Sequence, residues 1–178
     1  MENMEKDLKT EIFDWIKVIV SAFLLATLIN SFLIVNAAVP TGSMRATIME
    51  GDRLIAFRTS YMFSDPSRFD IIIFSCHQGG DQLYIKRVIG LPGETVEIIE
   101  GEVFINGESI AHLEHYVTEE IPRDSFALTT IPEDSFFVLG DNRNRSHDSS
   151  SWDNSYLHRS YIIGRAIFQY FPRIRMLQ

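Results

Sequence analysis

The stretch Leu83-Tyr84-Ile85-Lys86-Arg87-Val88-Ile89 decides the fold class of this 178-residue chain. Apolar and β-branched residues dominate it, and no helical periodicity runs through it, which is typical of a strand. From Pro40 onward, short apolar runs of this kind alternate with turn residues, at 53–58, 70–74, 95–99, 102–105, 135–139 and 161–170. Many short strands at such spacing predict a mostly β fold of the sandwich or barrel-like kind.

The clearest turn signal is Asn106-Gly107, which follows the run at 102–105 and predicts a tight β-hairpin. Residues 111–133 are acidic and less regular, so we expect them to form an excursion from the main sheets. Residues 40–178 are numerous enough to bury a core of their own. We therefore expect one β domain over this range.

Composition excludes several classes of protein. The formal net charge of −8 argues against nucleic acid as a partner, because nucleic-acid proteins normally present a basic face. The single cysteine, Cys76, rules out an intrachain disulfide and the usual multi-cysteine zinc site. His112 and His115 lack further ligands at a credible spacing, so we expect neither a metal nor another cofactor.

Residues 18–39 form an uncharged, mostly apolar stretch of 22 residues. A helix of that length spans roughly 33 Å, against about 30 Å of bilayer hydrocarbon. Trp15 and Lys17 precede the stretch, where an aromatic ring and a snorkelling amine suit the membrane interface, and Pro40 ends it. We predict a transmembrane anchor at 18–39, preceded by a leader at 1–17.

A cleavable signal peptide is the main alternative to an anchor, since Asn36-Ala37-Ala38 places small residues after the apolar run. The leader argues against this alternative, because it carries five acidic residues and only three lysines, unlike a secretion signal. Those three lysines, against the one early Arg45 after the span, favour a cytoplasmic N-terminus. Residues 40–178 would then lie outside the cytoplasmic membrane.

Lys86 is the only lysine after the anchor. Strand alternation places it on one face with Tyr84 and Val88, among largely apolar neighbours. Loss of hydration there favours the neutral amine, and a base near neutrality needs a pKa about three units below the ordinary value. Judged alone, the residue fits a catalytic base or an ordinary snorkelling or salt-bridged lysine.

Two further segments could carry chemistry. Pro40-Thr41-Gly42-Ser43-Met44 predicts an irregular turn that could expose the Ser43 hydroxyl beside a backbone N–H, although a simple turn leaving the membrane fits equally. The polar run at 140–150 follows an apolar strand, and such loops either remain solvated or position functional groups.

Taken in order, these segments resemble the serine–lysine bacterial type I signal peptidases, in their Bacillus-type single-pass form. The matching motifs are Pro40-Thr41-Gly42-Ser43-Met44, Gly51-Asp52 with the strand after it, residues 69–74 with 84–94, and Gly140-Asp141-Asn142-Arg143 through Ser149. The resemblance runs from the anchor to about Gly164 and implies an antiparallel β-sheet catalytic domain behind one transmembrane helix.

The resemblance also implies roles for individual residues. Ser43 would be the nucleophile and Lys86 its general base, oriented by a hydrogen bond from Ser146. The Ser43 N–H and the Thr41 hydroxyl would hold the oxyanion, Arg87 would pair with Asp141, and Asp148 would brace the loop. Pockets for small substrate residues would be lined by Val39, Pro40, Met44, Ile48, Tyr84 and Ile85.

The implied activity is cleavage of signal peptides from exported preproteins, after small residues at positions −1 and −3, beside the lipid bilayer. Two alternatives stay open: a related protease that cleaves itself or one dedicated partner, and a silent membrane-tethered module that binds peptides. Two residues depart from the family pattern, namely Ala46 in place of proline and Ser150 in place of arginine. We expect Arg145 or Arg159 to replace that arginine as the partner of Asp148, and the backbone at Ala46 to be slightly looser.

Three other groups have plainer interpretations. His147-Asp148 suggests a Ser-His-Asp triad, but that arrangement is defined by geometry rather than by neighbouring positions in sequence. Cys76-His77 is best explained as an ordinary loop pair. Tyr61-Met62-Phe63 fits equally a contact with the bilayer interface and packing in the core.

Overall fold

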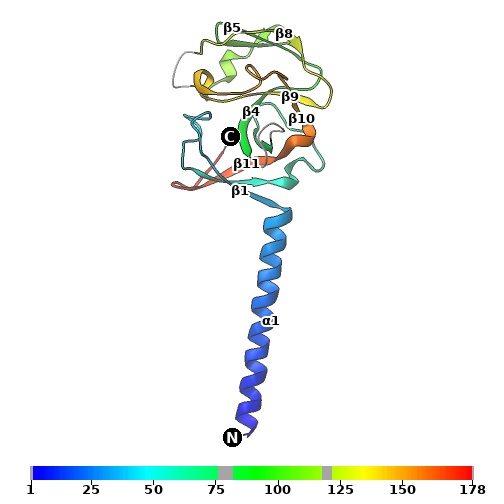
Figure 1. The fold of residues 1–178 in the computed structure, drawn as a ribbon, viewed down its shortest axis with the longest axis vertical. Coiled ribbons are helices and arrows are strands. Elements are labelled where there is room, and N and C mark those ends of the chain that lie inside the picture. Colours follow the sequence, from blue (N-terminus) through cyan, green and yellow to red (C-terminus); the bar gives the residue numbers. More distant parts are fainter. Residues whose placement is uncertain (1, 76–81, 118–121, 178) are drawn as a thin grey trace.

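The computed structural model describes residues 2–75, 82–117 and 122–177, so Cys76 and His77 lie outside the described residues. One long helix, α1 (Glu2–Phe32), leads into a domain of twelve described strands. The strands gather at one end of the helix, as Figure 1 shows. Within α1, Thr10–Phe32 is long and apolar enough to cross a bilayer, with a mean hydropathy of 2.1 and no part of it buried in the protein.

The predicted span of 18–39 is wrong at its C-terminal end. The helix stops at Phe32, and the next apolar residues form strand β1 (Ile34–Ala38), which pairs with β2. Val35 and Ala37 point into the core while Asn36 and Ala38 are exposed, which is the alternation of a strand. An anchor helix and a core strand are both apolar, so hydrophobicity alone does not mark the boundary between them.

The larger sheet carries the nucleophile turn and the candidate base. Its neighbouring strands are all antiparallel and run in the order β1, β2, β11, β3, β4, β9, β10, with β12 paired to β11. Their bounds are β2 Arg53–Phe57, β3 Ile71–Ser75, β4 Leu83–Gly90, β9 Ser135–Leu139, β10 Leu157–His158, β11 Ile162–Phe171 and β12 Arg175–Met176. The quoted stretch at 83–89 is thus a strand near the centre of this sheet.

A second sheet lies at the end of the domain farthest from α1 (Figure 1). Its order is β7, β6, β5, β8, with bounds Glu108–Ser109, Glu102–Ile105, Thr95–Ile99 and Phe126–Thr130. The Asn106-Gly107 hairpin is confirmed, with φ of 52° and 81° at its two turn residues. The interpretation of 111–133 as an irregular excursion is wrong in part, because β8 within it pairs with β5.

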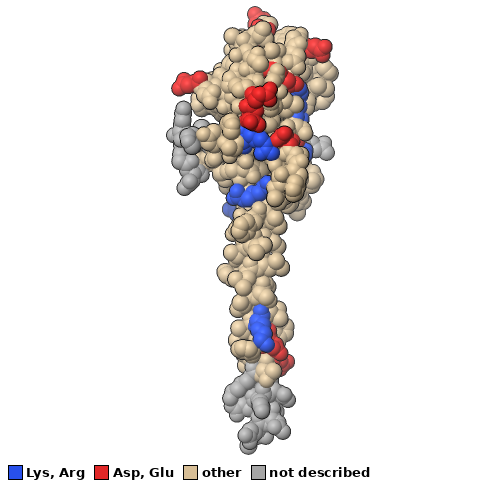
Figure 2. All heavy atoms as spheres, turned by 90° about the vertical axis from the view of Figure 1, so that its right-hand side faces the viewer, with Lys and Arg blue, Asp and Glu red and all other residues tan. Residues whose placement is uncertain are grey.

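Short 3₁₀ helices complete the described elements: η1 Arg58–Tyr61, η2 Ala111–Leu113, η3 Arg143–Arg145 and η4 Arg159–Tyr161. Charge is unevenly distributed along the molecule. Figure 2 shows no Lys, Arg, Asp or Glu on the part of the helix nearest the domain, whereas acidic residues are prominent at the opposite end of the domain. The uncharged helix surface next to the domain is the part suited to hydrocarbon.

Candidate active site

Ser43 lies in the connection between β1 and β2, and buried residues that follow it hold this connection in place. Met44 and Ile48 are 1% and 0% exposed, and the Ile48 N–H donates to the Met44 carbonyl at 2.7 Å. At its two ends, the Val39 N–H donates to the Asp52 carbonyl, and the Gly51 N–H donates to the Val39 carbonyl. The loop therefore presents Ser43 from a closed, core-anchored turn.

Lys86 reaches this turn from the centre of β4. Its Nζ lies 2.7 Å from Ser43 Oγ, and the residue is only 3% exposed. Burial lowers the pKa of Lys86 from 10.5 to about 8, against the negative charges of Asp148 and Asp141, which raise it. A neutral amine at this distance can accept the hydroxyl proton, which is the geometry that nucleophilic catalysis requires.

The loop after β9 closes over the nucleophile turn. Asn142 makes two contacts with it, since its N–H donates to the Ser43 carbonyl and its Nδ2 donates to the Gly42 carbonyl, both at 3.0 Å. A side-chain carbon at Gly140 would overlap the Ser43 carbonyl and Ser146 Oγ, so only glycine fits there. Asn142 was matched by motif but given no role from sequence, because its role depends on two contacts with residues about 100 positions earlier in the chain.

Ser146 does not make the hydrogen bond predicted for it. Its Oγ is buried next to Gly140 and has no hydrogen-bond partner among the described residues. The hydroxyl therefore sits beside the nucleophile turn without orienting the Lys86 amine. Burying a hydroxyl without a hydrogen-bond partner destabilises the folded state. We therefore expect bound substrate, or rotation of the Ser146 side chain, to provide the missing hydrogen bond.

The predicted support contacts around Lys86 are present. Arg87 donates to both oxygens of Asp141, at 2.9 and 2.7 Å, with the two side chains 2% and 0% exposed. The guanidinium also lies over the Tyr116 ring, 4.1 Å from its centroid. This pair fixes the start of the loop after β9 against the strand that carries the base.

Asp148 braces the same loop, as predicted, but not through an arginine. Its carboxylate accepts the Gly140 N–H at 2.9 Å and the Ser150 hydroxyl at 2.8 Å. Ser150 thus supplies the partner itself, in place of the arginine that the family usually has there. Arg159, one of the expected substitutes, instead contacts Asp65 and the Tyr61 carbonyl.

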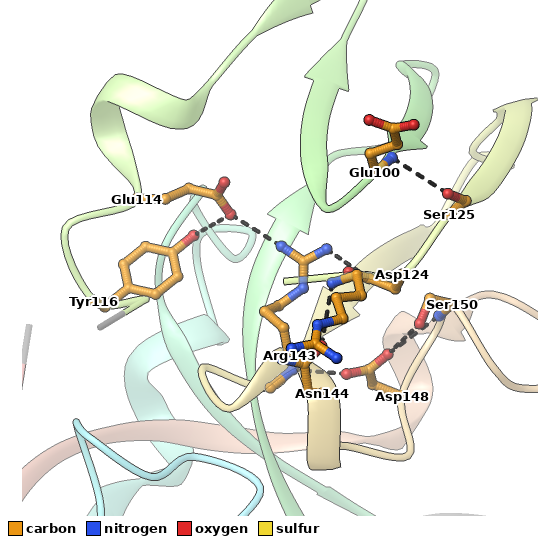
Figure 3. Close-up of polar contacts among 11 residues, drawn as sticks. Glu100, Glu114, Tyr116, Asp124, Ser125, Arg143, Asn144, Asp148 and Ser150 are labelled. Carbon is orange, nitrogen blue, oxygen red and sulfur yellow. Dashed lines mark hydrogen bonds and ion pairs between the residues drawn. The ribbon is translucent and has the colours of Figure 1, made fainter. Parts of the chain in front are cut away.

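Arg143 connects the loop after β9, which we call the catalytic loop, to the segment that leads into the second sheet. Its guanidinium lies between Glu114 and Asp124, with contacts of 3.4 and 2.6 Å, as Figure 3 shows. Burial raises the pKa of Glu114, whose carboxylate also accepts the Tyr116 hydroxyl. Sequence reasoning missed this cluster, because its members come from three separate segments with no shared motif.

A cavity of about 200 Å³ opens beside Ser43. Five of the six predicted substrate-contacting residues line it together with Thr41, namely Val39, Pro40, Met44, Tyr84 and Ile85. Ile48 was placed wrongly, because it does not line this cavity and is fully buried in the core cluster that also contains Met44. Leu83, Arg145 and His147 also line the cavity and were not predicted to do so.

The backbone at Ala46 differs from the expectation of slight loosening. Its φ is 75°, in the left-handed region. Proline is locked near −65°, so the residue that the family usually has could not adopt this conformation. The change from proline therefore accompanies a differently shaped turn after the nucleophile.

The remaining candidates take ordinary structural roles. His147 contacts Ser151 Oγ at 2.9 Å, so the described hydrogen bonds do not form a triad with Ser43. No group of three or more potential metal ligands occurs among the described residues. In the Tyr61-Met62-Phe63 cluster, Tyr61 is buried and donates to Asp70, whereas Phe63 is 96% exposed.

A buried amine in contact with a serine hydroxyl, in an apolar cleft of an antiparallel β domain, defines a serine hydrolase that uses lysine as its base. Comparisons with known proteins agree with this class. Residues 12–171 match the family model described as "Signal peptidase, peptidase S26". This chain belongs to that peptidase family.

Individual relatives carry matching names. The chain is 40% identical over 172 residues to signal peptidase I of Leptolyngbya laminosa, covering 93% of this chain and 82% of that protein. It is 33% identical to signal peptidase I S of Bacillus subtilis, over 96% and 94% of the two chains. A crystal structure of a signal peptidase I from Enterococcus faecalis is 35% identical, with a TM-score of 0.46 over 57% of this chain and 97% of that chain.

Proposed function

We propose that this protein removes signal peptides from exported preproteins as a membrane-anchored serine endopeptidase. The observation that carries the proposal is the 2.7 Å contact between Ser43 Oγ and the buried Lys86 Nζ. The relatives named signal peptidase I support the substrate class. Membership of the peptidase family supports hydrolysis of a peptide bond.

The chemistry follows from the position of the two groups. Neutral Lys86 takes the Ser43 proton while Oγ attacks the carbonyl carbon of the scissile bond, and the resulting oxyanion accepts hydrogen bonds from the Ser43 N–H and the Thr41 hydroxyl. Lys86 then returns the proton to the departing amine, which leaves an acyl-enzyme on Ser43. Water activated by the same amine hydrolyses the ester and regenerates the free serine.

The sheet provides a place for an extended substrate. Along β4, residues 83–86 pair with β3 on one side, whereas β9 pairs only with residues 87–90 on the other side. No described strand pairs with the second edge of 83–86, so we expect a substrate strand to bind there, in line with β9. The apolar cavity at its end is small, which suits Ala-sized residues at positions −1 and −3.

The helix would place this chemistry at a membrane surface. The 23 residues Thr10–Phe32 span about 35 Å as a helix, enough to cross the hydrocarbon. Lys6 and Lys9 precede the span and Lys17 lies in its first third, so we assign the N-terminus to the cytoplasm and the β domain to the outer side. A signal peptide held in the same bilayer would then bring its cleavage site to Ser43.

Purified full-length protein in detergent tests the proposal. The protein should cleave several unrelated preproteins at their signal-peptide junctions, and Ser43→Ala or Lys86→Ala should abolish cleavage without unfolding the domain. Ser160→Ala, an exposed serine outside the site, is the matched control and should retain activity. Substantial cleavage by either active-site variant would contradict the assignment.

Two outcomes would favour the alternatives. Cleavage of only one preprotein, or of the protein itself, would indicate a dedicated protease. Failure of an acylating penem probe to label Ser43 in the wild-type protein would indicate a silent peptide-binding module.

A further inference from the structure

An aromatic groove of about 530 Å³ lies next to the active-site cavity. Three ring contacts connect its walls: Phe74 stacks with Tyr84 at 5.8 Å between centroids, Phe74 meets Trp152 edge-on at 5.9 Å, and Trp152 contacts His147 at 6.4 Å. Leu157 and Tyr161 add further apolar surface. The volume is within the range of sites that hold ligands.

The groove is continuous with the catalytic cavity, because Tyr84 and His147 line both. Tyr84 lies two residues before Lys86 on the same face of β4, which is roughly 7 Å along an extended strand. A chain that crosses Ser43 therefore reaches the groove within two or three residues of the scissile bond.

The walls of the cavity indicate which part of the substrate enters the groove. Val39, Met44 and Ile85, which we expect to contact the small residues before the cut, line the cavity but not the groove. His147, on the loop after β9, lines both the cavity and the groove, and its ring contacts Trp152. The part of the substrate that follows the cut would leave past His147.

We propose that this groove is a binding subsite for the first residues of the mature protein, at about the second to fourth positions after the cut. The inference rests on the proposed function and adds a source of substrate selectivity to it. Among the residues that the structure describes, the groove lining holds one carboxylate, Asp153, and no lysine or arginine. It therefore favours an aromatic or large aliphatic side chain and disfavours an acidic one.

A series of preprotein-derived peptides tests the subsite. The peptides share one sequence before the cut and carry Ala, Phe or Asp in turn at each of the second to fourth positions after it. At one or more of these positions, wild-type protein should cleave the Phe peptide with a kcat/KM about tenfold above that of the Ala peptide, and the Asp peptide more slowly still. Equal values for all three at every position would overturn the subsite while leaving signal-peptide cleavage itself intact.

Two variants separate the groove from general damage to the fold. Trp152→Ala should reduce the Phe preference to within about twofold, whereas Trp152→Phe should retain most of it. Because Trp152 packs against the core, Asn154→Trp provides a second test, filling the groove from an exposed position. That variant should lower kcat/KM for the Phe peptides selectively, so an equal loss for all peptides, or a preference that follows residues before the cut, would refute the proposal.

Discussion

The pH dependence of cleavage should reveal how strongly the protein dehydrates Lys86. Burial lowers the pKa of this amine from 10.5 to about 8. At pH 7 the neutral fraction is then about 9%, against about 0.03% for an ordinary lysine, a gain of roughly 300-fold in reactive base. The same pKa shift means that the folded protein disfavours the charged amine, relative to the neutral one, by a free energy of about 3 kcal/mol.

Only the neutral amine can accept the Ser43 proton, so kcat/KM should rise with pH and reach half of its plateau near pH 8. The assay is the initial rate of cleavage of a preprotein at low concentration, between pH 5.5 and pH 10, with the full chain in detergent. At more than about one pH unit below the midpoint, the rate should fall tenfold per pH unit. A midpoint above pH 9.5 would refute the argument that burial prepares the base.

The negative charge of Asp148 provides a second test of the Lys86 pKa. That carboxylate raises the Lys86 pKa, so Asp148→Asn should move the midpoint to lower pH even if the variant is slower. Asp134→Asn, an exposed carboxylate in the turn before β9, is the control and should leave the midpoint in place. A midpoint that moved to higher pH in Asp148→Asn would show that the electrostatic reasoning has the wrong sign.

Three further changes should alter stability, measured by unfolding of the full chain in detergent. Lys86→Met should abolish cleavage yet raise the free energy of unfolding by about 1–3 kcal/mol below pH 8. This gain should disappear between pH 8 and pH 10.5, because the wild-type amine loses its charge over that range, and no gain below pH 8 would argue against a buried amine. Ala46→Pro should lower the free energy of unfolding by about 2 kcal/mol or more, because proline cannot adopt a φ of 75°, whereas Ala46→Gly should change it by less than about 1 kcal/mol. A larger loss in Ala46→Gly than in Ala46→Pro would show that the backbone conformation of this turn is misassigned. Asp141→Asn should cost about 3–5 kcal/mol because it removes the negative charge that faces the buried Arg87 guanidinium, whereas Asp65→Asn, in an exposed pair, should cost less than about 1 kcal/mol. Similar losses in both variants would show that burial does not set the cost.

Strand positions could be predicted from sequence where one face or both faces of a strand are buried. The runs at 70–74 and 83–89 have β-branched and apolar residues bounded by turns, and they form the neighbouring strands β3 and β4. The alternation that placed Lys86 with Tyr84 and Val88 is the same physical signal. By contrast, β8 at Phe126–Thr130 is mostly exposed, so it lacks the hydrophobic pattern that identifies a strand.

The site was predictable in its chemistry but less so in its contacts. A lone lysine in an apolar strand and a serine in a Pro-Gly turn are local signals, and the motif resemblance joins them. Ile48 could not be distinguished by sequence from the residues that line the cavity, since all of them are apolar. Which hydroxyl or amide contacts the nucleophile depends on loop conformation, which is why Asn142 was missed and the Ser146 hydrogen bond was wrongly predicted.

The pairing of β4 with β9 connects catalysis to the stability of the fold. Its register places Arg87 opposite Leu139, so the loop that begins at Gly140 starts beside the strand position that carries Lys86. A slip of one residue would turn Lys86 to the opposite face of the sheet and separate Arg87 from Asp141. The hydrophobic residues that fix this register are therefore what bring the amine to Ser43 and cover it with the catalytic loop. Mutations in the core between these strands should consequently reduce activity through the position and hydration of the base, before the domain as a whole unfolds.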